Sequence, residues 1–156
     1  MNTFMFSIIS YVAVVASAVT IGDGGLIARM SDAAVKKCLD CICQASTKCI
    51  PPKECWKAND TDVLVCGAYL ISEKYWIDAG EPFDREVGGY FKCAYHKICA
   101  ENTIIAYNTR HGRDCDGNGV YDCLDIGLMH HGEKDNCENP WIKTTDFWKD
   151  YTICLS

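Results

Sequence analysis

Cysteine content constrains this chain more than any other feature of its sequence. The chain has 156 residues and 12 cysteines, and every cysteine lies after residue 37. An even, dense set in a small chain indicates six disulfides, each of which typically contributes about 2–4 kcal/mol. Zinc is the alternative, because Cys38 and Cys41 have ligand spacing, but no second C-x-x-C pair follows at a suitable distance. The spacing alone leaves roughly ten thousand pairings open. The cysteines are Cys38, Cys41, Cys43, Cys49, Cys55, Cys66, Cys93, Cys99, Cys115, Cys123, Cys137 and Cys154.

The N-terminus has the pattern of a secretory signal peptide. Residues 4–18 form one apolar run without charge that ends in Ala16-Ser17-Ala18, a small-x-small cleavage pattern. The run is shorter than the roughly 20 residues of a membrane span. A buried N-terminal helix is the less favoured alternative. We expect a signal peptide at 1–18, a flexible glycine-containing leader at 19–35, and one secreted, soluble, monomeric domain at 36–156.

Charge and hydrophobicity exclude several classes of function. The net charge is −6 and the predicted pI is about 5.1, without a basic stretch. This acidic balance argues against nucleic acid as a partner and gives no attraction to anionic membranes. Hydrophobic residues make up 49% of the chain, which is too many for a disordered protein.

Periodicity and capping residues predict one α+β domain that is mostly helical and has a small sheet. Apolar residues at helical spacing follow Ser31, whereas Pro51 and Pro52 exclude a helix in the next segment. Two strand-like runs flank Gly67 and predict a hairpin. The expected elements are a helix that starts near Ser31 or Asp32, strands at 63–65 and 69–71, helices over 93–111 and 123–130, and a last helix capped by Thr144 or Thr145.

The ordered cysteine series carries a family resemblance. Three cysteines lie within the six residues 38–43, and further cysteines and a Tyr75-Trp76-Ile77-Asp78 segment follow in a characteristic order. From about residue 36 to 154 the chain resembles the invertebrate-type (i-type) lysozymes, the family that includes the destabilases. The resemblance implies a lysozyme-like α+β fold and cleavage of the glycan strands of peptidoglycan, with no cofactor required. The remaining residues of the pattern are Cys49, Cys55, Cys66-Gly67, Cys93, Cys99-Ala100-Glu101-Asn102, and Cys123 and Cys137 around His130.

The family's catalytic acid is missing from this chain. Glycan cleavage uses a protonated carboxyl group for the leaving oxygen and a second carboxylate that attacks or stabilises the transition state. The resemblance places the acid at Ala45, whose methyl group cannot donate a proton. It places the second carboxylate at Asp60, or at Asp62 if the register slips.

A second set of family residues is also replaced. The Ser–Lys pair proposed for isopeptide cleavage in destabilases falls on Val63 and Ser72, and a family glutamine falls on Leu70. Two family cysteines become Ala79 and Thr103, which removes one whole disulfide if those two pair with each other. Several cleft positions have thus turned apolar together, which favours lost chemistry over a single chance replacement.

The resemblance, together with the spacing, also implies a set of disulfide pairs. Four would close short loops, and two would tie the first helix to the C-terminal half. The expected pairs are 43–49, 55–66, 93–99, 123–137, 38–115 and 41–154.

One segment matches the calcium-loop template. Residues 114–125 carry oxygen ligands at loop positions 1, 3, 5, 9 and 12, a backbone carbonyl at position 7 and a glycine at position 6. The alternative is a solvated Asp/Gly turn held by Cys115 and Cys123. We expect a structural calcium ion, weakened by the short Asp at position 12. The expected ligands are Asp114, Asp116, Asn118, the Val120 carbonyl, Asp122 and Asp125.

Three further features bear on the glycan. Tyr75 and Trp76 are candidates to stack on sugar rings, and core aromatics are the equal alternative. His130 matches a family histidine, and with His131 it reads most simply as a surface pair. Asn59 begins the chain's Asn-Asp-Thr glycosylation pattern, and a glycan there would crowd the cleft.

Together these features predict a secreted i-type lysozyme relative with weak or absent muramidase activity and a glycan-binding cleft. The alternative is an active digestive or antibacterial lysozyme that combines Asp60 with a relocated acid. Asp40 and Glu54 are the nearest candidates by sequence.

Overall fold

The computed structural model describes residues 25–58, 61–83 and 88–156. The predicted signal peptide and the first part of the predicted leader lie outside these residues. A short 3-10 turn at Ile27–Arg29 (η1) buries Ile27, and the first helix, α1, spans Asp32–Thr47. The Ser31 side chain caps α1 by accepting a hydrogen bond from the Ala34 amide. The folded domain therefore begins before residue 36, where the sequence pattern placed its start.

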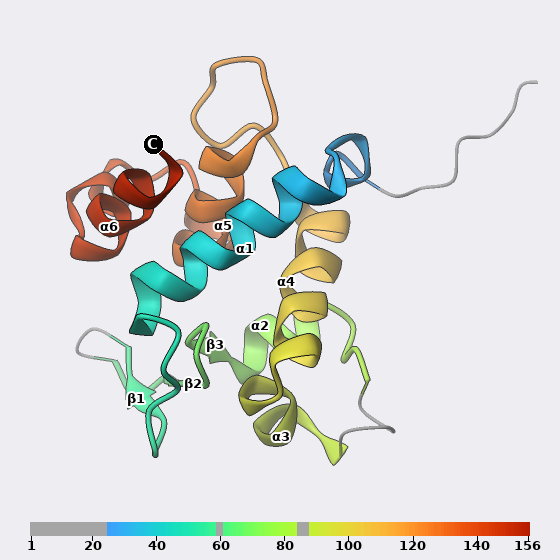
Figure 1. Ribbon diagram of the computed structural model, residues 1–156, viewed down its shortest axis with the longest axis vertical. Helices are drawn as coiled ribbons and strands as arrows, with labels where there is room; N and C mark the ends of the chain where they lie inside the picture. The colour runs from blue at the N-terminus through green and yellow to red at the C-terminus, as the bar shows by residue number, and fades with distance from the viewer. Residues whose placement is uncertain (1–24, 59–60, 84–87) are drawn as a thin grey trace, which may run out of the picture.

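Four long helices form the body of the molecule (Figure 1). Helix α1 packs against α5 (Cys123–Asn136) and α6 (Asp146–Leu155), and α4 (Lys97–His111) packs against α5. Ile42, Met129 and Tyr151 are fully buried where these helices meet. The mostly helical α+β fold predicted from the sequence is confirmed.

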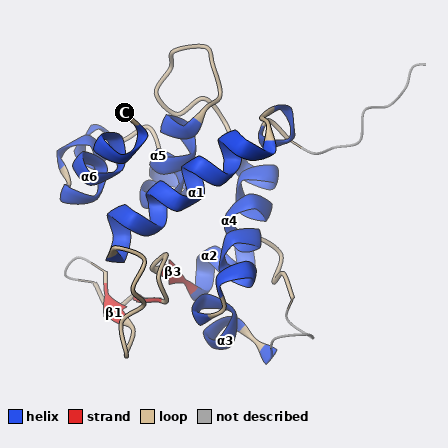
Figure 2. Cartoon of the chain, viewed as in Figure 1, coloured by secondary structure: helices blue, strands red, loops and turns tan. Residues whose placement is uncertain are grey.

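A three-stranded antiparallel sheet lies at one end of this body, beside α2 and α3 (Figure 2). Val65 in the central strand is opposite Trp56 on one side and Ser72 on the other. The predicted hairpin is the β2–β3 pair, and its turn needs Gly67, because a Cβ there would lie 1.8 Å from the Ala94 carbonyl oxygen. The elements at this end are β1 (Trp56–Lys57), β2 (Leu64–Cys66), β3 (Ile71–Ser72), α2 (Glu73–Asp78) and α3 (Tyr90–Tyr95).

The helix expected over residues 93–111 is two helices. His96 interrupts it with an extended backbone, φ −95° and ψ 110°, and its ring accepts a hydrogen bond from the Cys99 amide to cap α4. The short Cys93–Cys99 disulfide spans the same break.

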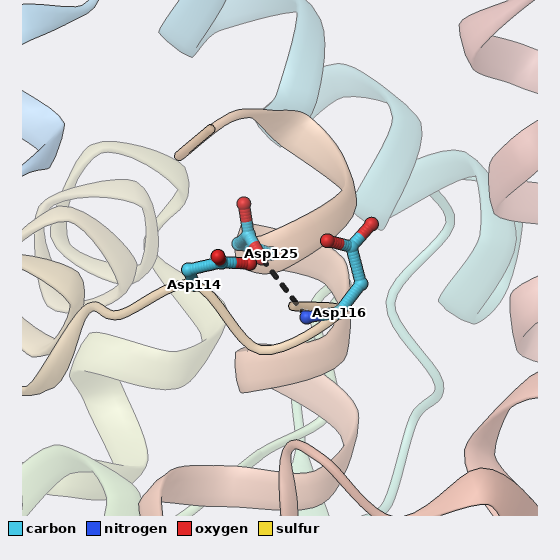
Figure 3. A group of neighbouring side chains, drawn as sticks. All are labelled: Asp114, Asp116 and Asp125. Atoms are coloured by element: carbon cyan, nitrogen blue, oxygen red, sulfur yellow. Dashed lines mark hydrogen bonds between the residues drawn. The ribbon is translucent and has the colours of Figure 1, made fainter. Parts of the chain in front are cut away.

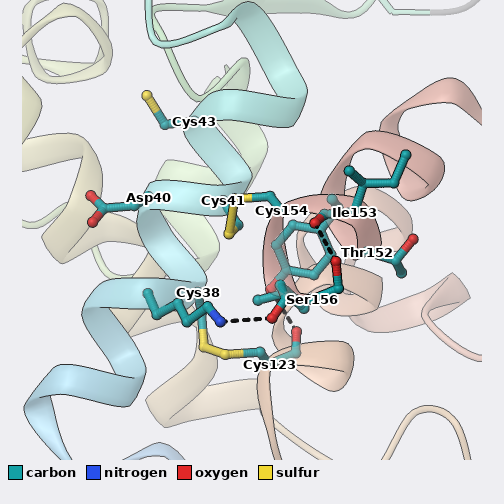
Figure 4. The surroundings of a disulfide bond; sticks show 12 residues. Cys38, Asp40, Cys41, Cys43, Cys123, Thr152, Ile153, Cys154 and Ser156 are labelled. Atoms are coloured by element: carbon teal, nitrogen blue, oxygen red, sulfur yellow. Dashed lines mark hydrogen bonds between the residues drawn. A yellow bond between two sulfur atoms is a disulfide. The ribbon is translucent and has the colours of Figure 1, made fainter.

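The described chain holds six disulfides and no free cysteine. Four of the expected pairs are confirmed: 41–154, 43–49, 55–66 and 93–99. Figure 4 shows two bridges from α1, Cys38–Cys123 to α5 and Cys41–Cys154 to α6. The bridges fix the orientation of α1 against the C-terminal half of the chain.

Two expected pairs are wrong. The structure joins Cys38 to Cys123 and Cys115 to Cys137, not 38 to 115 and 123 to 137. The reason is the length of α5, because Cys123 and Cys137 lie at its opposite ends. A helix of this length separates its ends by about 20 Å, whereas a disulfide requires Cα atoms less than about 7 Å apart.

Candidate functional site

A cleft of about 1030 Å³ runs between the C-terminal end of α1, the sheet, and the segment from α5 to α6. The wall from α1 and the sheet, called the apolar wall below, carries apolar Ala45, Val63, Val65 and Leu70, and it also includes Ser46, Lys57, Thr61 and Ser72. The opposite wall carries polar and aromatic side chains from α5, from the 3-10 helix η3 (Pro140–Thr144) and from α6. These side chains are His130, His131, Glu133, Trp141, Asp146 and Phe147.

The positions that the resemblance assigns to chemistry meet in this cleft. Ala45 comes from α1, Val63 precedes β2, Leu70 precedes β3, and Ser72 ends β3. These positions are scattered over 28 residues of sequence (45 to 72, inclusive), so their meeting in one cleft agrees with the correspondence drawn from the cysteine series. None of the four side chains is a carboxyl group or an amine.

The expected second carboxylate, Asp60, and the expected glycosylated Asn59 lie outside the described residues. Their described neighbours Ala58 and Thr61 line the cleft. Asp62, the alternative register, is an exposed residue whose carboxylate pairs with Lys57 at 2.9 Å, and it is not among the lining residues.

Neither expected relocated acid lines the cleft. Asp40 pairs with Lys36 on the exposed face of α1. Five residues separate it from Ala45, which turns its side chain about 140° around the helix. Glu54 is exposed in the loop before β1. Their positions outside the cleft therefore exclude both Asp40 and Glu54 as its general acid.

Glu133 is a cleft carboxylate that sequence reasoning missed. Its backbone has φ 56° and ψ −177°, a conformation inside α5 that is essentially restricted to glycine. The Ser72 hydroxyl donates a hydrogen bond to Oε1 at 3.2 Å, and Lys74 Nζ lies 3.7 Å from Oε2. The side chain is 31% exposed. The sequence gives little indication that Glu133 is special, because Gly132-Glu133 fits a continuous helix.

The aromatic side chains that face the cleft differ from those expected. Trp76 is only 6% exposed, and its indole N–H bonds to the Pro82 carbonyl, so it is a core residue that cannot stack on a sugar. Tyr75 lines the floor of the cleft but is also buried, with its ring stacked on Tyr107 at 3.7 Å. Trp56 and Trp141 line the cleft with 48% and 42% of their surface exposed.

The two histidines form part of the cleft wall and are not a surface pair. His130 Nε2 donates to the Tyr69 carbonyl at 2.9 Å, which fixes the tautomer with Nδ1 as an acceptor. Burial lowers the pKa of His130 to about 4, so the ring is neutral near pH 7. The His131 ring stacks on Phe147 with centroids 4.7 Å apart, and burial lowers its pKa as well.

The predicted calcium loop brings three of its ligands together. One carboxylate oxygen each from Asp114, Asp116 and Asp125 lies within 4.8 Å of the others (Figure 3). Asp122 instead caps α5, where its Oδ1 accepts from the Leu124 amide at 2.7 Å. Asn118 Oδ1 accepts from the Val120 amide at 2.7 Å. Three carboxylates fit a hard cation, although all five side chains already accept hydrogen bonds from backbone amides.

Backbone hydrogen bonds and burial shift the pKa values of two carboxyl groups in this loop. The amides of Gly119, Gly117 and Asn118 hold the pKa of Asp114 below its usual value. Burial raises the pKa of Asp125, even though its carboxylate accepts bonds from three backbone amides. The loop is therefore already ordered by its own amides.

Comparison with known proteins identifies the family of this chain. The destabilase family pattern matches residues 35–154. The chain belongs to the destabilase family, that of the i-type lysozymes. It is 28% identical over 128 residues to invertebrate-type lysozyme 6 of Caenorhabditis elegans, across 80% of this chain and 89% of that one. It is 33% identical over 115 residues to a lysozyme of Magallana gigas, across 72% and 74%.

Solved structures of lysozymes share the fold. The inhibitor-bound lysozyme of Meretrix lusoria superimposes with a TM-score of 0.61 at 25% identity, across 76% of this chain and 88% of that one. The same lysozyme in complex with Aeromonas hydrophila PliI gives a TM-score of 0.60 at 26% identity, across 83% and 92%. Within the described residues, no helix has the length and apolar character of a membrane span.

Proposed function

We propose that this i-type lysozyme relative is a secreted protein whose cleft binds the β-1,4-linked glycan strand of peptidoglycan and hydrolyses it weakly or not at all. The observation that carries the proposal is the composition of the cleft. Exposed Trp56 and Trp141 offer flat apolar faces to sugar rings, and Ala45, to which the resemblance assigns the family's acid, lines the same cleft.

Loss of the acid sets the expected scale of activity. General acid catalysis typically contributes about 10²–10⁴-fold to a rate. Asp60, which the resemblance assigns as the second carboxylate, can stabilise positive charge but cannot also protonate the leaving oxygen. Binding does not need the acid, because stacking and hydrogen bonds to the sugar hydroxyls supply it.

Secretion is part of the same proposal. Six disulfides are typical of an oxidising compartment, and the apolar run that ends at Ala18 has the pattern of a cleaved signal peptide. Protein recovered from the medium of producing cells should begin at Val19. An N-terminus at Met1 would contradict the cleavage.

The test of binding is co-sedimentation with purified insoluble peptidoglycan. Trp141→Ala should weaken binding about tenfold, which corresponds to about 1.4 kcal/mol of lost stacking. Phe91→Ala is the matched control, because Phe91 is 58% exposed on α3 and does not line the cleft. Equal binding by the wild type and both variants would reject the cleft as the binding site.

An active enzyme with a relocated acid remains the second candidate function. The specific observation in its favour is that the cleft presents Glu133, although not on the wall where the family places its acid.

A further inference from the structure

Carboxyl groups reach the cleft from only one of its two walls among the residues that the structure describes. Glu133 comes from α5 and Asp146 from the first turn of α6. Asp146 lies beside Phe147 in a regular helical turn. Glu133 lies where the helical backbone of α5 is interrupted, so its conformation is more unusual than that of Asp146.

The backbone of Glu133 is the second observation. At φ 56° and ψ −177° an L side chain is strained, and such strain persists mainly at functional sites. The preceding residue, Gly132, is held closely, because a Cβ there would lie 2.5 Å from the Ile142 side chain and 3.0 Å from the Cys137 backbone. The Cys115–Cys137 disulfide fixes the same segment. The fold therefore imposes this backbone, and the chain places a carboxylate on it.

The contacts of Glu133 orient its carboxylate through one oxygen and leave the other oxygen without a hydrogen bond. Ser72, which caps α2, orients Oε1 through its hydroxyl. Lys74 stands 3.7 Å from Oε2 and is itself held by Asp78 at 2.7 Å. Within the described chain no group hydrogen-bonds to Oε2, and a third of the side chain faces the solvent. One oxygen is thus available to a ligand in the cleft.

We propose that Glu133 is the relocated general acid of this cleft, so that the acid has moved from α1 at Ala45 to α5. The inference rests on the proposed function, because it requires the cleft to hold a glycan strand. In the reaction the protonated Glu133 carboxyl gives its proton to the glycosidic oxygen as the C1–O bond breaks. Water then adds its hydroxyl to C1, and its remaining proton returns to the Glu133 carboxylate, so that the net change is addition of one water.

The test measures hydrolysis and binding separately on the same purified peptidoglycan. Release of reducing ends should be slow but measurable for the wild type. Glu133→Gln should reduce this release by about 10²-fold or more, while co-sedimentation with the peptidoglycan stays within about twofold. Glu54→Gln, an exposed carboxyl outside the cleft, is the matched control and should leave both readouts unchanged.

A second variant guards against misfolding. Glu133→Gly removes the carboxyl but suits the backbone conformation, so it should fold and bind yet release no reducing ends. Hydrolysis by either Glu133 variant at the wild-type rate would overturn the inference. Binding by the wild type without any release of reducing ends would also overturn it, and would leave the glycan-binding proposal standing. Absence of binding by the wild type would overturn the proposed function itself.

Discussion

The two walls of the cleft have separate chemical characters. The wall from α1 and the sheet, with Ala45, Val63, Leu70 and Ser72, has no carboxyl group or amine at these positions, to which the resemblance assigns chemistry. The wall from α5 and α6, with His130 and Glu133, supplies polar groups at positions for which the resemblance assigns no acid. The described positions that the resemblance assigns to catalysis lie on the first wall, whereas the second wall matches the family only at His130. The contrast teaches that replacements on one wall do not reveal which acidic and basic groups the other wall supplies to the cleft.

The largest expected effect comes from restoring an acid on the apolar wall. In a Glu133→Gln background, Ala45→Glu should raise the release of reducing ends from peptidoglycan by about 10²–10⁴-fold. The reason is that the α1 position would again supply a proton to the leaving oxygen. Ala45→Gln in the same background has nearly the same shape but cannot act as an acid. Equal rates for the Glu and Gln variants would show that the apolar wall lacks more than its acid.

The polar wall should make stability depend on pH. His130 has a folded pKa of about 4, against about 6.5 in an unfolded chain. Below pH 6.5 the unfolded state therefore binds a proton that the folded state does not, and stability falls as pH drops from about 6.5 to about 4. The full loss is on the order of 3 kcal/mol. Burial of His131 acts in the same direction.

Denaturant unfolding at several pH values measures this effect. His130→Gln should flatten the dependence of the unfolding free energy between pH 6.5 and 4, because glutamine does not titrate there. His131→Gln should flatten it less. A His130→Gln variant that keeps the full slope would place the titrating group elsewhere.

The fold was largely predictable because its signals are local. Ser31, Thr145 and Gly67 mark two helix starts and a hairpin turn, and the structure uses each for that purpose. The wrong disulfides were not predictable from spacing, since Cys123 and Cys137 read as a short loop until α5 is known to run its full length between them. The break at His96 was hidden for a similar reason, because both sides of it have helical periodicity.

The site was less predictable because it depends on tertiary position. Ala45, Val63 and Leu70 meet in the cleft as the resemblance implies. Trp76, a candidate for sugar stacking, is in the core, whereas Trp141 reaches the cleft from a segment without any motif. Glu133 could not be found from periodicity, because the conformation that sets it apart is a property of the folded backbone.

The strain on the polar wall predicts a trade-off between stability and chemistry. Glu133→Gly should be about 1–2 kcal/mol more stable than Glu133→Ala, because alanine keeps the unfavourable φ of 56° and glycine does not. Chemical denaturation of the two variants measures the difference. Comparison with alanine removes the effect of losing the Ser72 hydrogen bond, which both variants share. Equal stabilities would mean that the backbone relaxes when the glutamate is removed.

The smallest expected effect concerns the loop that leads into the polar wall. Loop residues Asp122 and Asp125 cap the start of α5, the helix that carries His130 and Glu133. Asp114, Asp116 and Asp125 repel one another there, and bound calcium would relieve that repulsion. Because the side chains of Asp122 and Asn118 already accept backbone amide bonds, affinity should lie near the weak, millimolar end of the range for such loops.

Calcium at about 10 mM should then stabilise the fold by about 1 kcal/mol, which a thermal melt detects as a rise of a few degrees in Tm. Magnesium at the same concentration is the control for general salt effects, since its demand for octahedral geometry fits this loop poorly. Asp116→Asn should abolish the rise, because it removes a half-buried carboxylate of the cluster and leaves the capping of α5 by Asp122 and Asp125 intact. An equal rise with magnesium, or in the Asp116→Asn variant, would reject calcium binding by the loop. Backbone amides and the Cys38–Cys123 and Cys115–Cys137 disulfides would then hold the start of the polar wall without a metal ion.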